Sequence, residues 1–130
     1  MEFHEAFTQY LKSYSGLNSL ISGRVYPDFI PQNKPLPAIV YHLISSDVWY
    51  TLEGEQELQI VNYQFDCHGN SDKEAFGVYK QLRKAFKNYQ GDMNGFNVQM
   101  IEIEVILGKD YSDPIQDHTY KIEFKFYYTE

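Results

Sequence analysis

Residues 118–128 read HTYKIEFKFYY, and in this stretch apolar and charged side chains alternate residue by residue. Successive side chains of a β-strand point to opposite faces of a sheet, so this alternation is typical of a strand with one buried and one solvated face. Lys121, Glu123 and Lys125 occupy the polar face. The stretch therefore predicts an antiparallel sheet that is covered on one face only. The apolar face carries Tyr120, Ile122, Phe124, Phe126 and Tyr128.

Three further strands are predicted upstream. Residues 38–44 (AIVYHLI) and 58–67 are rich in branched and aromatic residues. The connection between them contains Gly54 and is too short for a helical crossover, which favours an antiparallel hairpin. Residues 96–107 form the next predicted strand, and the polar residues 108–117 connect it to the last one.

Two segments have helical periodicity. Residues 2–14 place aromatic side chains and Leu11 on one side, with polar residues on the other. Residues 71–89 place apolar side chains within one arc and lysines opposite, with Ser71 as the capping residue. Residues 91–95 (GDMNG) then end this helix.

The chain has 130 residues, 43% of them hydrophobic, which is enough to bury one core. With 12 Tyr and 9 Phe, aromatic side chains must supply much of the packing. The element order is helix-strand-strand-helix-strand-strand. We expect one α+β domain over residues 1–130, with a four-stranded, mostly antiparallel sheet and helices packed on one face.

Proline dominates the approach to the first strand. Four of the five prolines lie between residues 23 and 45 (GRVYPDFIPQNKPLPAIVYHLIS), so residues 26–36 are predicted to be an extended loop. A second anomaly follows at the predicted hairpin end, where Trp49 and Tyr50 stand in place of polar turn residues. These two aromatics either fold back on the core or anchor an interface.

Charge and cysteine content restrict the partners and the compartment. The net charge is −7 and the isoelectric point about 5.0, which argues against tight, sequence-independent binding of nucleic acid. The single cysteine, Cys67, excludes an internal disulfide. The opening MEFHEAFTQY lacks the apolar core of a secretion signal, and no stretch is long enough for a membrane span. We therefore expect a cytosolic protein that contacts no membrane.

The chemistry-bearing residues form no recognisable active site. Cys67 and His68 are adjacent and point to opposite faces of a strand, so they cannot form a catalytic pair. Pairing of Cys67 with the distant His42 or His118 remains a remote alternative to a buried, inert thiol. The histidines lack HxxxH and HxH spacing and there is no CxxC, so we expect no catalytic residues, no metal site and no cofactor. Asp110, Asp113 and Asp117 are read as a solvated connection.

Several ordered strings carry a resemblance to a known family. GRVYPDFIPQNKPLPAIVYHLIS is followed by YTLEGE, by a strand that ends in YQFDCHG, by a helix and by a last strand KIEFKFYY. This pattern resembles the tail completion, or tail-to-head joining, proteins of long-tailed bacteriophages, which are tail terminator-like. The resemblance covers residues 20–89 and 113–128.

The resemblance implies a structural virion protein that is not an enzyme. Such a protein is made in the host cytoplasm, caps the tail tube, stops its elongation and forms the tail-to-head junction, usually as a hexameric ring. Its partners would be further copies of itself, the tube protein and the head-tail connector, and DNA would pass without tight binding. The candidate subunit or tube interface comprises Trp49, Tyr50, Leu52, Pro31 and Pro35. The candidate acidic channel lining comprises Glu53, Glu55 and Glu57.

Two other functions remain open on the sequence. A head-side connector or neck adaptor protein shares the size and acidity of a tail terminator. A small enzyme that uses Cys67 with a histidine belongs to a different class, and fast alkylation of Cys67 at neutral pH would favour it.

Overall fold

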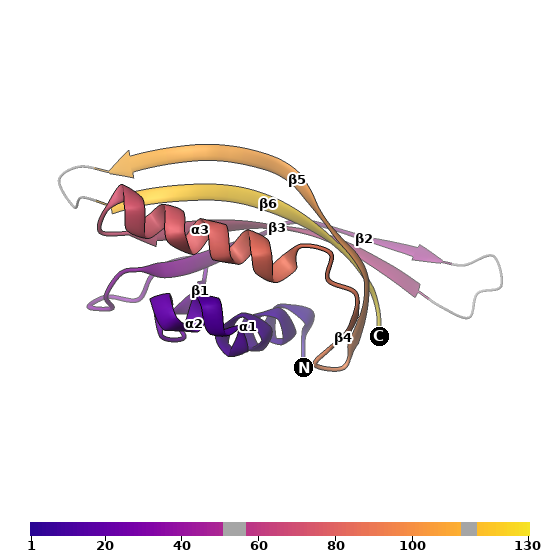
Figure 1. Ribbon diagram of the computed structural model, residues 1–130. Coiled ribbons are helices and arrows are strands. Elements are labelled where there is room, and N and C mark those ends of the chain that lie inside the picture. Colours follow the sequence, from indigo (N-terminus) through magenta and orange to yellow (C-terminus); the bar gives the residue numbers. More distant parts are fainter. Residues whose placement is uncertain (51–56, 113–116) are drawn as a thin grey trace.

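The computed structural model describes residues 1–50, 57–112 and 117–130 (Figure 1). Its helices are α1 (Phe3–Ser13), α2 (Ser15–Ile21) and α3 (Asp72–Phe86). Its strands are β1 (Val25–Pro27), β2 (Ala38–Tyr50), β3 (Glu57–Gly69), β4 (Gly91–Met93), β5 (Phe96–Ser112) and β6 (Asp117–Thr129). They form one sheet in the order β1-β2-β3-β6-β5-β4, which curves around the three helices (Figure 1).

The predicted four-stranded, mostly antiparallel sheet is wrong, because the described sheet has six strands and is mixed. The missing strands are short and lie at its two edges. β1 falls partly in the proline-rich segment that was predicted to be a loop, and it pairs in parallel with residues 39–41 of β2. Pro27 is tolerated there because an edge strand need not donate a hydrogen bond on its outer side.

The other missing strand, β4, comes from the segment GDMNG that was predicted only to end a helix. It pairs antiparallel with residues 96–98 of β5. Asn94 and Gly95 connect the two strands and have φ angles of 51° and 101°. Positive φ at both central residues is the signature of a type I′ hairpin turn, for which Asn-Gly is the favoured pair.

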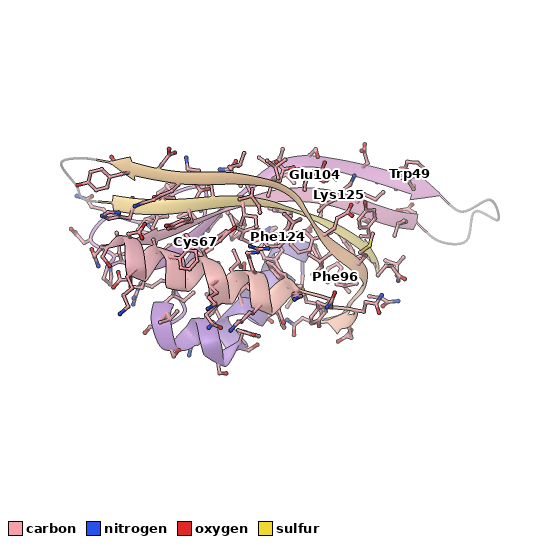
Figure 2. The ribbon with its side chains drawn as sticks, turned by 45° about the horizontal axis from the view of Figure 1, so that its top comes forward. Trp49, Cys67, Phe96, Glu104, Phe124 and Lys125 are labelled. Carbon is pink, nitrogen blue, oxygen red and sulfur yellow. The ribbon has the colours of Figure 1, made fainter. Side chains whose placement is uncertain are left out.

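The alternation in β6 is confirmed. Ile122, Phe124, Phe126 and Tyr128 are buried on the face that the helices cover, and the residues between them are half-exposed. From α1, Phe3 and Phe7 pack edge-on or stacked against these rings. Figure 2 shows Phe124 on the side of the sheet that faces the helices. The core is therefore aromatic, as the composition predicts.

Both predicted helices are confirmed, with changed boundaries. α1 ends at Ser13 and a second short helix, α2, follows at once. The Ser71 hydroxyl accepts a hydrogen bond from the Glu74 N–H and caps α3, which ends at Phe86 rather than at residue 89. None of the described helices is long and apolar enough to cross a membrane.

The two hairpins are longer than predicted. β2 continues to Tyr50, β3 begins at Glu57, and β5 continues to Ser112 through residues that were predicted to be a polar loop. The β2–β3 end carries Trp49, which lies far from the helices (Figure 2). These extensions create the surfaces described next.

Candidate assembly surfaces

The sheet leaves much of two long strands without an outer neighbour. β1 pairs only with residues 39–41 of β2, and β4 only with residues 96–98 of β5. Within the described residues, the rest of each strand presents unpaired backbone groups along one edge. The β2–β3 hairpin extends beyond one end of the helices, and the β5–β6 hairpin ends at the opposite side (Figure 1).

Exposed apolar side chains gather on the same two strands. Fourteen large apolar side chains are exposed in the described part of the chain, four of them on β2 and six on β5. Trp49 is 64% exposed and Ile106 is 54% exposed. Because large contiguous apolar patches are typical of interaction sites, these two strands are the candidate contact surfaces. The others are Leu43, Ile44 and Val48 on β2, and Met100, Ile103, Val105, Leu107 and Tyr111 on β5.

The pairing of these two strands is also irregular. The pairing register shifts once in β2, between Leu43 and Ser45, and three times along β5. An extra residue in one strand bends that strand and resets the alternation of its side chains. Residues 105–107 (VIL) are all exposed because both faces of this part of β5 are uncovered, and every residue from 103 to 112 is exposed.

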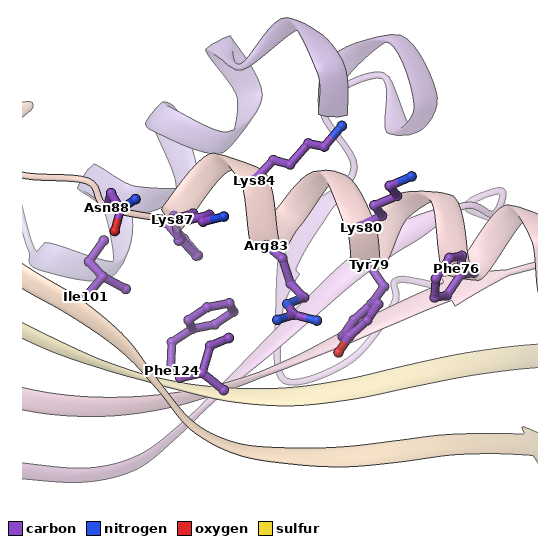
Figure 3. Close-up of a pocket in the computed structure, with 11 residues that line it drawn as sticks. Phe76, Tyr79, Lys80, Arg83, Lys84, Lys87, Asn88, Ile101 and Phe124 are labelled. Carbon is purple, nitrogen blue, oxygen red and sulfur yellow. The ribbon is translucent and has the colours of Figure 1, made fainter.

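A groove of about 560 Å³ lies between α3 and the uncovered part of β5. Ile101, Ile103 and Phe124 from the sheet form its apolar floor. Figure 3 shows Arg83 directed from α3 toward the sheet, beside Tyr79. The Arg83 guanidinium carbon lies 5.7 Å from the centre of the Tyr79 ring. The remaining lining residues are Phe76, Lys80, Lys84, Phe86, Lys87 and Asn88.

The groove is cationic although the chain as a whole is acidic. Lys80, Arg83, Lys84 and Lys87 line it, and none of its described lining residues is acidic. Residues 75–91, which include most of α3, contain no Asp or Glu at all. The groove therefore suits a ligand that is both apolar and acidic.

The residues predicted for the interface lie at two separate ends of the molecule. Trp49 projects from the end of β2, whereas the segment with half-buried Pro31 and exposed Pro35 lies at the opposite end (Figure 1). Asn70 donates a hydrogen bond to the Leu36 carbonyl, which fixes this segment to the domain. The structure does not bring the two groups together.

Part of the predicted site lies outside the described residues. This applies to Leu52, to Glu53 and Glu55 of the channel prediction, and to Gly54 and Asp113. Tyr50 ends β2. Glu57 begins β3 with an exposed side chain.

Cys67 has the environment of an inert thiol. It is fully buried, and this burial raises the pKa of its thiol far above the ordinary value. His42 lies on the other face of the sheet, where its Nε2 is 3.1 Å from Asp66. Within the described residues, no hydrogen bond joins Cys67 to His42 or to His118. The geometry therefore gives no support to a thiol–imidazole pair.

The other two histidines lie apart, His68 in β3 and His4 in α1. His68 Nδ1 lies 2.8 Å from an Asp117 carboxylate oxygen, and His4 Nδ1 lies 3.1 Å from the Tyr41 hydroxyl. In residues 1–50, 57–112 and 117–130, no three His, Cys, Asp or Glu side chains are grouped so that they could hold a metal ion.

Sequence reasoning missed the β5 surface and the groove. The available signal was the string IEIEVIL, in which the last three residues are all apolar and cannot all face one core. The cationic side of α3 was recognised from its spacing. Its position beside an apolar floor depends on the partner strand, which the helix sequence does not contain.

Comparisons with known proteins bear on this arrangement. The chain matches the family described as "Tail completion protein gp17" over residues 5–127. A comparison with curated protein sequences gave no significant match. One solved structure with the same fold is a chain described as "Virion of native gene transfer agent (GTA) particle". That chain is 12% identical, with a TM-score of 0.68 over 96% of this chain and 92% of that one.

Proposed function

Because the chain belongs to the family of tail completion protein gp17, a family of phage tail proteins, we propose that its copies form a ring on the end of the tail tube. The ring stops the tube from growing and provides the surface to which the head is joined. Its partners are further copies of itself, the tube protein and the head-tail connector.

The observation that carries this proposal is the pair of uncovered apolar strands. β2 and β5 are the second strands from the two ends of the sheet order, and they expose different side chains. Two different surfaces on one subunit favour head-to-tail contacts, which close into a ring when the rotation between neighbours allows it. A twofold dimer would need only one self-complementary surface.

The charge of the chain agrees with a ring through which DNA passes. Each copy carries a net charge of −7, so a ring is strongly acidic. Phosphates would find few cations to replace their counterions, and DNA would pass without tight binding. That Glu53, Glu55 and Glu57 line the channel stays a prediction.

The test is direct observation on tails. Tubes assembled without this protein are mixed with the purified, gold-labelled chain and viewed by negative-stain microscopy. We expect label at one end of each tube, and tubes of uniform length when the protein is present during assembly. Label on DNA-filled heads, with bare tube ends, would contradict the proposal and favour a head-side connector.

A further inference from the structure

Among the described residues, no side chain of its own chain fills the groove between α3 and β5. Its floor is apolar and its helix side carries Arg83 and Lys87. Apolar groups next to Arg at a concave site have the composition of an interface centre. A complementary ligand must therefore bring apolar side chains together with carboxylates.

The free end of the β2–β3 hairpin, which we call the arm, has this chemistry. In its described part, Asp47, Val48, Trp49 and Glu57 are exposed. Residues 47–57 read DVWYTLEGEQE, with four acids and no Lys, Arg or His. All the charged residues of the arm are acidic, whereas all the charged residues of segment 75–91 are basic.

We propose that the groove receives the arm of a neighbouring copy. The described end of β2, with Trp49, lies away from the helices and so does not reach the groove of its own chain (Figure 2). Trp49 would lie on the apolar floor, and Asp47 and Glu57 would pair with Arg83 and Lys87. This inference deepens the ring proposal and rests on it, because it names the two surfaces that each contact joins.

The docking competes with the predicted channel lining. A Glu57 carboxylate that pairs with a cation in the groove of a neighbouring copy does not face a channel. The two positions of this residue exclude each other, so the same experiment decides between them.

The experiment is a charge swap in the full chain. The groove variant carries Arg83→Glu and Lys87→Glu, the arm variant carries Asp47→Lys and Glu57→Lys, and the swap variant carries all four changes. Sedimentation velocity measures self-association up to about 1 mM, where a contact of millimolar Kd becomes visible. We expect each double variant to associate at least about tenfold more weakly than the unchanged chain, and the swap variant to recover.

The matched control carries Lys12→Glu and Lys73→Glu, and it changes the net charge by the same amount as the groove variant. Both residues are exposed and neither lines the groove. It should associate like the unchanged chain. Circular dichroism checks that every variant is folded. Recovery in the swap variant excludes a general charge effect. The groove variant associates weakly because acids then face acids, and the arm variant because cations then face cations; only the swap variant restores opposite charges.

Three results would overturn the docking. These are no association of the unchanged chain up to about 1 mM, undiminished association of the groove variant, or failure of the swap variant to recover. Loss of duplex DNA binding in the groove variant, with unchanged self-association, would assign the groove to nucleic acid instead. If groove variants still bind tube ends in the microscopy test, the docking fails while the proposed function stands.

Discussion

Phe7 is the residue on which the aromatic core converges. It is fully buried, and its ring lies 5.0 Å from Tyr41, 4.9 Å from Tyr63 and 5.7 Å from Phe126 between ring centres. We expect Phe7→Ala to lower the free energy of unfolding by about 3–5 kcal/mol, because a cavity would remain among rigid rings. Urea denaturation measures this. Phe29→Ala, at a 71% exposed site, should cost less than about 0.5 kcal/mol, and equal losses at both sites would contradict the packing.

Buried tyrosines give the fold a dependence on alkaline pH. Burial raises the pKa of Tyr63 to about 12, and that of Tyr128 also to about 12. An unfolded tyrosine has a pKa near 10, so the folded chain holds these protons more tightly. Stability is therefore complete below about pH 10 and is lost as the pH rises toward 12.

Tyr63→Phe tests this linkage, because it keeps the ring and removes one titrating hydroxyl. We expect the variant to match the unchanged chain at about pH 8 and to lose less stability between about pH 10 and pH 12. Urea denaturation at a series of pH values measures the difference. Parallel pH profiles for the two proteins would show that Tyr63 does not contribute.

Among the elements, those with a clear period were predictable. β6 alternates over its length and α3 holds one apolar arc, so both were read correctly from side chains alone. β1 and β4 have three residues each, too few for a period, and their pairing depends on the strand beside them. The exposed surface of β5 was missed because the sequence of a strand does not show which part of it the helices leave uncovered. Trp49 drew attention because a tryptophan is unusual where a turn is expected; the structure shows it exposed at the end of β2, and its role in an interface stays a prediction.

Two glycines test the local backbone in opposite directions. Gly95 has a φ of 101° in the β4–β5 turn, so Gly95→Ala should destabilise the fold by about 1 kcal/mol or more. Gly77 lies inside α3 with open space where a Cβ would stand, so Gly77→Ala should stabilise it by about 0.5–1 kcal/mol. Thermal unfolding of both variants measures the shifts. An unchanged or more stable Gly95→Ala variant would contradict the turn assignment, and a less stable Gly77→Ala variant would contradict the open space at that helix position.

At the scale of the whole molecule, the important feature is that its two ends differ. One end presents the arm with Trp49. The other end presents the exposed part of β5, with Ile106 and its apolar neighbours. A subunit with two unlike surfaces is blocked from closing a ring when either surface is damaged. Its undamaged surface can still bind one partner, and this separates head-to-tail assembly from twofold pairing.

Mixing two defective chains makes that difference measurable. Trp49→Ser removes the apolar anchor of the arm, and Ile103→Ser removes apolar area from the β5 floor of the groove. Both sites are exposed, so each variant should keep the melting temperature of the unchanged chain. Each variant alone should associate weakly, because every contact lacks one partner surface. An equal mixture should form dimers and nothing larger. The intact arm of one variant meets the intact β5 surface of the other, and the two surfaces left over in this dimer are both damaged. Light scattering after size exclusion resolves dimers from rings, and a mixture no more associated than its components would exclude head-to-tail contacts through these strands.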